Sequence, residues 1–229
     1  AHYSEISSTD WSWSNLIADF DNDGLRDIHI TNGLLRDIRN SDADKKVDQF
    51  VKNYISKYIE NNPNKGNIDI WEILPLDDVL SLLPSVKLPN YMFKNNDDFT
   101  FKNVSSSWGI DKLSFSNGSA YGDLDNDGDL EIVINNVNSE PFLYRNLSVE
   151  NTKNNFIRFK LKNTQNKSSL GTRCILYTPE KTQYAETTSI RGMYSSSETE
   201  IHFGIGTEKI IDSLEIYWPN QKKQVLYSP

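Results

Sequence analysis

The chain has 229 residues, a formal net charge of −8 and a single cysteine, Cys174. The acidic balance argues against a nucleic-acid-binding protein, because neutralising phosphate groups requires a basic face. One cysteine excludes an internal disulfide framework and a cysteine-based zinc site. We interpret Cys174, within the alternating run GTRCILYT, as a small buried hydrophobic residue. No apolar run approaches the ~18 residues of a membrane-spanning helix, so the sequence predicts no membrane span in this chain.

The first clear feature along the chain is an internal repeat. Residues 19–33 (DFDNDGLRDIHITNG) align without a gap with residues 123–137 (DLDNDGDLEIVINNV), and eight of the fifteen positions are identical. Each copy has a strand-like segment before it, an acidic turn that contains glycine, and an alternating apolar run after the turn. Such a pattern is typical of a strand, a tight loop and a second strand. The repeat therefore predicts a duplicated β unit.

The segment between the two copies has a helical character. A shorter helical stretch is predicted over residues 69–83, broken near Pro75 and closed by Pro84. Before it, over residues 41–62, apolar residues recur at the spacing of one helix face. We interpret residues 34–88 as a helical insertion whose apolar face packs against the β unit. The residues of this face are Val47, Phe50, Val51, Tyr54, Ile55, Tyr58 and Ile59.

Strand signals return after Pro89. The segments YMFKN and FTFKN are separated by a polar turn and predict a hairpin, and six alternating segments follow from residue 155 onward. Short strands at this spacing favour a small antiparallel sandwich or barrel-like domain. The predicted fold is mainly β, with an N-terminal region over residues 1–150 that carries the insertion and a C-terminal β domain over residues 151–229.

The two acidic turns have the composition of metal-binding loops. Acidic residues stand at loop positions 1, 3, 5 and 9 in both copies, and a glycine at position 6 permits a sharp turn. Alternate residues of a tight loop can point toward a common centre, and the backbone carbonyl at position 7 adds a further oxygen. Hard oxygen ligands of this kind suit Ca²⁺ better than Mg²⁺, which keeps more of its water. The predicted ligands are Asp19, Asp21, Asp23, the Leu25 carbonyl and Asp27 in the first loop, and Asp123, Asp125, Asp127, the Asp129 carbonyl and Glu131 in the second.

These loops are not EF-hands, because position 12, where that motif requires glutamate, is Ile30 in one loop and Ile134 in the other. A metal-free turn rich in Asp, Asn and Gly is the alternative, but four acids within nine residues repel one another when nothing neutralises them. We expect two bound Ca²⁺ ions with a structural role, because a saturated loop within a hairpin leaves no open position for a substrate. The C-terminal domain has no such loop, so its melting is expected to be nearly independent of calcium.

The acidic repeats resemble the FG-GAP/VCBS blades of calcium-binding β-propellers, through the pattern D-x-D-x-D-G-x-x-D/E between two strands. The C-terminal region is similar to the ASPIC/UnbV domain in the segments NFIRFKL, GTRCILY, EIHFGIG and DSLEIYWPN. This order of domains is found in cartilage acidic protein-like chains and in many secreted or surface proteins of Bacteroidetes-type bacteria. A propeller has about 4–8 blades, so the resemblance implies that the chain is the C-terminal part of a larger protein whose other blades are partners. It also implies an extracellular or outer cell-surface location.

No catalytic residue is predicted. The sequence contains no G-x-S-x-G elbow, H-E-x-x-H helix, P-loop or G-x-G-x-x-G turn. We therefore expect a non-catalytic, calcium-stabilised interaction module that binds an extracellular protein or a glycan. The alternative is an accessory or catalytic part of a secreted polysaccharide-processing protein, because a glycosidase-like carboxylate pair can be hidden among so many acids.

Overall fold

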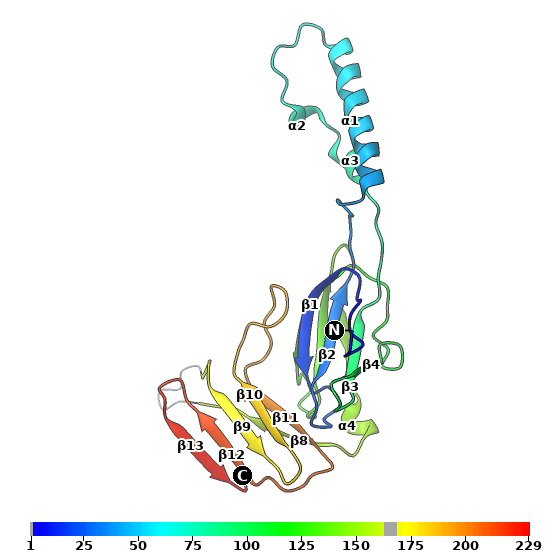
Figure 1. Ribbon diagram of the computed structural model, residues 1–229. Helices are drawn as coiled ribbons and strands as arrows, with labels where there is room; N and C mark the ends of the chain where they lie inside the picture. Colours follow the sequence, from blue (N-terminus) through cyan, green and yellow to red (C-terminus); the bar gives the residue numbers. More distant parts are fainter. Residues whose placement is uncertain (1, 163–168) are drawn as a thin grey trace. The chain divides into compact units, whose positions relative to one another are not determined.

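The computed structural model describes residues 2–162 and 169–229. These residues form a mainly β structure, with few helices and several antiparallel sheets (Figure 1). The chain divides into two compact units. One combines Ala1–Gly33 with Leu88–Pro229, and the other, Leu34–Lys87, is inserted into it.

A four-stranded antiparallel sheet contains the first acidic repeat. Its strands are β1 (Ser12–Ala18), β2 (Asp27–Asn32), β3 (Tyr91–Asn95) and β4 (Phe101–Asn103), and they lie side by side in that order. The acidic loop joins β1 to β2, whereas the whole insertion separates β2 from β3 in the sequence. The hairpin predicted from YMFKN and FTFKN is confirmed, because β3 pairs with β4.

A three-stranded sheet repeats this arrangement around the second acidic loop. It consists of β5 (Ser116–Gly122), β6 (Glu131–Asn136) and β7 (Phe142–Tyr144), in that order, and the short helix α4 (Ser148–Asn151) follows. The pairing of the first two strands shifts register at the same repeat position in both sheets. The duplicated β unit predicted from the sequence is therefore present in the fold.

The two sheets share one apolar core. Leu16 and Phe20 come from the first repeat and Ile134 from the second, and each is at most 2% exposed. Side chains alternate between the two faces of a strand, so the alternating runs supply one buried face each. This packing brings the two acidic loops together, and the Asn22 side chain donates a hydrogen bond to the Gly128 carbonyl (Nδ2 to O, 3.0 Å).

The inserted unit is built around one long helix. α1 (Ser41–Asn61) confirms the helix predicted over residues 41–62, and the Asn40 side chain caps it by accepting hydrogen bonds from two N–H groups of the first turn. Two short helices follow, α2 (Ile70–Ile73) and α3 (Leu76–Ser81). The break between them falls at Pro75, as predicted from the sequence.

The core of the inserted unit is thin. Of the residues of α1, all of which the structure describes, only Ala43 is fully buried. The predicted apolar face of the helix is half-buried, and its last member, Ile59, is 51% exposed. Packing of this face against the β unit stays a prediction.

The described residues of the C-terminal region form six strands, as predicted. β8 (Asn155–Phe159) pairs with β11 (Ile201–Gly206), and the other four strands form a sheet of order β10-β9-β12-β13. Cys174 is fully buried in the core that both sheets share, and burial raises the pKa of its thiol to about 12. Its interpretation as a buried hydrophobic residue is confirmed. The strands of the larger sheet are β9 (Arg173–Tyr177), β10 (Thr182–Glu186), β12 (Ser213–Tyr217) and β13 (Lys223–Tyr227).

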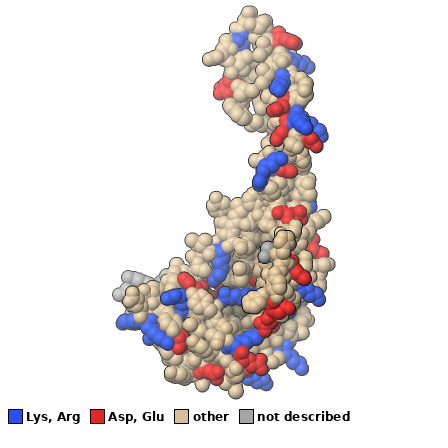
Figure 2. Space-filling model, in the orientation of Figure 1, with Lys and Arg blue, Asp and Glu red and all other residues tan. Residues whose placement is uncertain are grey.

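The described residues form open sheets, with no closed barrel or propeller among them. The blade assignment and the domain boundary at residue 150 stay predictions, since residues 88–229 belong to one compact unit. None of the helices in the described part of the chain is both long and apolar enough to cross a membrane. Lys and Arg side chains are intermixed with Asp and Glu side chains on the face drawn in Figure 2.

Candidate metal centre

The two acidic loops turn the chain with the same backbone conformation. Asn22 and Gly24 have φ angles of 59° and 86°, and Asn126 and Gly128 have φ angles of 63° and 98°. Glycine and asparagine are the residues that adopt this left-handed region most readily. The shared D-N-D-G segment therefore specifies the same turn twice.

The first loop brings three of its predicted ligands together. Carboxylate oxygens of Asp19, Asp21 and Asp27 lie within 4.8 Å of one another. The backbone N–H groups of Asp23 and Gly24 hold Asp19 in place by donating to its Oδ1 (3.1 Å) and Oδ2 (2.8 Å). Asp21 Oδ1 is buried and has no hydrogen-bond partner among the described residues. The loop therefore presents buried carboxylate oxygens to a common centre.

Burial makes the ionised form of these carboxylates unfavourable in the first loop. It raises the pKa of Asp19 to about 8 and the pKa of Asp27 to about 7, and the charges of neighbouring carboxylates add to both shifts. Burial also raises the pKa of Asp21, although a hydrogen bond from Lys94 opposes this shift. A cation bound at the centre would reverse these shifts, because it favours the ionised carboxylates.

Lys94, which the sequence reasoning missed, supplies positive charge to the first loop. Its ammonium group donates to Asp21 and, at 2.7 Å, to Asp23 Oδ2. Asp23 therefore faces Lys94 and lies outside the group of three converging carboxylates. The backbone N–H of Leu25 donates a hydrogen bond to Asp23 Oδ1 at 2.9 Å. The predicted contribution of the Leu25 carbonyl stays a prediction.

The second loop groups the carboxylates of Asp123, Asp125 and Asp127, whose oxygens again lie within 4.8 Å of one another. The guanidinium of Arg145 approaches Asp125 and Asp127 at 3.3 and 3.8 Å. Asp123 Oδ1 is buried and lacks a hydrogen-bond partner within the described part of the chain. Loop positions 1 and 3 thus converge in both loops, joined by position 9 in the first and position 5 in the second.

The acids at position 9 bind the backbone in the same way in both loops. Asp27 Oδ2 and Glu131 Oε2 accept hydrogen bonds from the N–H at loop position 2, at 3.2 and 2.8 Å. Their second oxygens accept from the N–H groups of Asn95 (3.0 Å) and Asn146 (3.3 Å). Both acids thus hold their loops closed by accepting backbone hydrogen bonds. Asp27 is also one of the three converging carboxylates of the first loop, whereas Glu131 is not among those of the second.

A basic residue followed by asparagine reaches each loop from the third strand of its repeat. Lys94 and Asn95 end β3, and Arg145 and Asn146 follow β7. The segments YMFKN and FLYRN correspond at an offset of 51 residues, against 104 for the loops. The insertion between β2 and β3 causes this difference. These residues can be recognised in the sequence when the two repeats are aligned without the insertion.

Asp129 anchors the helix that follows the second repeat. Its Oδ2 accepts from the Ser148 hydroxyl at 3.3 Å and from the Val149 N–H at 3.0 Å. Its carboxylate also converges with those of Asp127 and Glu150. The side chain of Asp129 therefore has a role that the sequence did not indicate, and the predicted role of its carbonyl stays a prediction.

The C-terminal strand β11 packs directly on the first loop. His202 Nε2 lies 2.6 Å from Asn22 Oδ1, and the Gly206 N–H donates to the Asn22 carbonyl at 2.8 Å. A Cβ atom at Gly204 would lie 2.5 Å from the Cα of Asn22 and would overlap Asp19 Oδ2. Gly204, the first glycine of the HFGIG segment, is therefore required for this close approach.

Strand β8 makes the corresponding contact with the second loop. The Arg158 guanidinium pairs with Asp123, and the ring of Phe156 occupies the place that a Cβ atom at Gly128 would need. No local pattern in the sequence indicates these contacts, because their partners are far apart along the chain. The expectation that the C-terminal domain melts independently of the loops did not include them.

The chemistry of both loops fits a calcium ion. The converging groups are carboxylate oxygens, which are the hard ligands that Ca²⁺ prefers. A buried oxygen without a partner costs about 1–3 kcal/mol or more when it is charged, and Asp21 Oδ1 and Asp123 Oδ1 are two such atoms among the described residues. A cation at each centre would supply the missing partner.

Comparison with known proteins bears on the C-terminal region. No curated protein matches the chain significantly. A family model described as ASPIC and UnbV matches residues 162–229, which include β9 to β13. The match covers less than half of the chain, and the FG-GAP assignment of the two repeats stays a prediction. The ASPIC/UnbV resemblance is thus confirmed for residues 162–229.

Proposed function

We propose that this protein is a calcium-stabilised interaction module that binds an extracellular protein or a glycan, with one structural Ca²⁺ in each of two FG-GAP-type blade loops. The observation that carries the proposal is that both loops bring three carboxylates together, with positions 1 and 3 in common and the third at position 9 in the first loop and at position 5 in the second. In each loop three carboxylates converge, and one of them has a buried oxygen without a described partner. A single acidic cluster often exists without a metal, but the duplication of geometry and of unsatisfied oxygen supports a common ligand.

In this proposal calcium organises structure and takes part in no reaction. The first ion would be held by Asp19, Asp21 and Asp27, and the second by the carboxylates of the 123–127 segment. Each ion would neutralise carboxylates that repel one another by about 1 kcal/mol per pair at 4 Å even in bulk water. Because β8 and β11 pack on the same loops, the ions would also stabilise the contacts between the loops and the C-terminal domain. Calcium is abundant outside cells, which suits loops of modest affinity.

Calorimetric titration of EDTA-treated protein with Ca²⁺ tests the proposal. We expect two sites, of which Asp21→Asn removes one and Asp125→Asn the other. Asp48→Asn on the exposed side of α1 is the matched control and should leave both sites intact. Absence of calcium uptake, or uptake that neither loop variant changes, would contradict the proposal. Calcium-dependent cleavage of a polysaccharide would instead favour a part in a polysaccharide-processing protein.

A further inference from the structure

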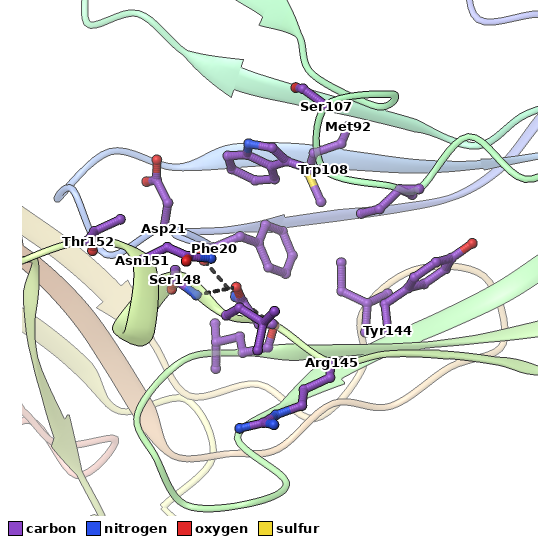
Figure 3. A pocket seen from close by; sticks show the side chains of 15 residues that line it. Phe20, Asp21, Met92, Ser107, Trp108, Tyr144, Arg145, Ser148, Asn151 and Thr152 are labelled. Atoms are coloured by element: carbon purple, nitrogen blue, oxygen red, sulfur yellow. Dashed lines mark hydrogen bonds between the residues drawn. The ribbon is translucent and has the colours of Figure 1, made fainter.

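A cavity of about 370 Å³ lies between the two acidic repeats, beside Trp108 (Figure 3). It is lined largely by core side chains of both sheets. Two polar atoms of its described lining residues lack a hydrogen-bond partner, Asp21 Oδ1 and the Tyr144 hydroxyl, but both are buried away from solvent. Asp21 also belongs to the first metal centre. Neither atom can therefore meet a ligand in this cavity.

A second cavity, of about 360 Å³, lies between the acidic repeats and the strands β10 and β11. All of its lining residues belong to one compact unit. Two arginines of this lining are accessible from solvent, because Arg26 is exposed and Arg191 is half-buried. Ligand pockets have volumes of about 300–1,000 Å³, so the space suits a ligand with a single ring.

The edge of the larger C-terminal sheet holds both arginines in place. β10 is an edge strand of this sheet, and the guanidinium of Arg26 donates a hydrogen bond to the carbonyl of Tyr184. The guanidinium of Arg191 donates to the carbonyl of Glu186 at 3.3 Å. Residues two apart on a strand are about 7 Å apart and face the same side. The two positive charges are therefore held near each other at one wall of the cavity.

Neither arginine is neutralised by the part of the chain that the structure describes. Arg26 and Arg191 form no ion pair with a described carboxylate, and each donates one hydrogen bond to a described residue. A guanidinium has five N–H donors, so each arginine keeps donors for a ligand. Like charges held close together repel one another. An anion between the two arginines would relieve this repulsion.

The carboxylates that also line the cavity are engaged elsewhere. Glu200 pairs with two basic side chains, at 2.6 and 3.0 Å. Glu186 is exposed to solvent, which screens its charge, and accepts a hydrogen bond from the Tyr184 hydroxyl at 3.0 Å. Asp19 belongs to the first metal centre, where a calcium ion would neutralise it. These acids therefore leave the two arginines available to an anionic ligand.

We propose that this cavity binds a sugar residue of an acidic glycan through the carboxylate of that sugar. The planar fork of a guanidinium matches a carboxylate with two parallel hydrogen bonds, and two such groups face the cavity. The ring of the sugar would lie against Tyr184 and Ile17, which line the cavity and are each 47% exposed. These side chains offer an accessible apolar surface to the C–H groups of the ring.

A glycan is favoured over a protein segment because the edge of β10 is covered. A peptide that binds at the edge of a sheet adds as a strand and pairs with free N–H and C=O groups of that edge. The carbonyls of Tyr184 and Glu186 already accept hydrogen bonds from the two guanidinium groups. A peptide strand would have to displace both arginines, whereas a sugar carboxylate needs only their remaining N–H groups.

This inference rests on the proposed function and deepens it by choosing an acidic glycan over a protein as the partner. The two claims fail separately. Calcium uptake without binding of an acidic sugar would overturn the inference alone. Binding of an acidic sugar by a protein that takes up no calcium would overturn the calcium-stabilised module alone.

Saturation-transfer NMR titration of the calcium-loaded full chain tests the inference with the methyl glycosides of glucuronic and galacturonic acid. We expect a saturable signal from at least one of them, and none from the methyl glycosides of glucose and galactose, which lack the carboxylate. Arg191→Gln should weaken binding about tenfold or more, because it removes a charged hydrogen-bond donor. Arg36→Gln is the matched control, because Arg36 is a half-buried arginine of the inserted unit, and it should leave binding unchanged.

If Arg191→Gln fails to fold, Arg26→Gln decides in its place, since the side chain of Arg26 is exposed. Absence of any saturable signal from the acidic glycosides, or a signal that neither arginine variant weakens, would overturn the inference. Acetate that binds as tightly as the acidic glycosides would overturn the choice of a sugar. Binding of a short peptide that contains glutamate, when neither acidic glycoside binds, would overturn the inference in favour of a protein partner.

Discussion

The two acidic loops share their spacing and their turn, but they differ in how much water reaches them. The acid at position 3 is 14% exposed in the first loop (Asp21) and 41% exposed in the second (Asp125). The basic partner from the third strand is 30% exposed in the first (Lys94) and 61% in the second (Arg145). Charge interactions are stronger where less water screens them. Equal spacing therefore brings the acids at positions 1 and 3 together in both loops, and we expect burial to decide how much each loop depends on a cation.

The largest expected effect comes from the contact between β11 and the first loop. Gly204→Ala places a methyl group against backbone and carboxylate atoms of that loop, and overpacking at such a place is expected to cost about 3 kcal/mol or more in free energy of unfolding. Chemical denaturation measures the loss. Gly66→Ala in the inserted unit is the control, because a Cβ atom there has no neighbour within 4 Å. Equal stability of the two variants would show that the first loop and β11 separate readily.

Acid should weaken the same contact through His202. Burial, with a contribution from the positive charge of Arg158, lowers the pKa of His202 from 6.5 to about 4. Protonation therefore favours the unfolded state, so the stabilisation is complete above pH 6.5 and is lost as the pH falls toward 4. The loss should reach about 3 kcal/mol at pH 4. Unfolding measured across this range should show a weaker pH dependence in His202→Gln and an unchanged one in His2→Gln.

Removal of calcium should destabilise the C-terminal domain as well as the loops. Metal bound only to the folded state contributes about 2.7 kcal/mol at a hundredfold excess over Kd. Because β8 and β11 pack on the loops, we expect EDTA to speed amide hydrogen exchange in β9 and β12 also. Asp21→Asn should have the larger effect and Asp125→Asn the smaller one, because the first loop is more buried. Unchanged exchange in β9 and β12 would restore the expectation of independent melting.

The smallest effects are expected at the basic residues of the third strands. In calcium-free protein, Lys94→Ala leaves partly buried carboxylates without their cation and should cost about 1–2 kcal/mol. Arg145→Ala removes a largely exposed partner and should cost less than about 1 kcal/mol. With calcium present, Lys94→Ala should bind the first ion more tightly, because the ammonium no longer competes for Asp21. Calorimetry on both variants checks the order, and equal responses would contradict the difference between the loops.

Local patterns were sufficient to predict the strands around each loop, α1, and the six C-terminal strands, because each of these depends on residues that are close in sequence. The converging acids Asp19, Asp21, Asp123 and Asp125 were predicted for the same reason. Lys94 was missed because the insertion shifts the third strand out of the alignment of the repeats. His202 was missed because it meets Asn22 from 180 residues away, and no periodicity in the sequence encodes such a contact. The cavity beside Trp108 likewise exists only once both sheets have packed.

The position of the insertion also has a consequence for the order in which the chain folds. β2 and β3 are hydrogen-bonded neighbours, yet 58 residues separate Asn32 from Tyr91, whereas five residues separate β6 from β7. Closing a flexible segment of the longer length costs about 2 kcal/mol more in chain entropy. Folding of α1 before the sheet closes would shorten the effective loop and recover part of this cost. We therefore expect the strands of the second repeat to pair first, so that the first repeat can then pack on their apolar side chains.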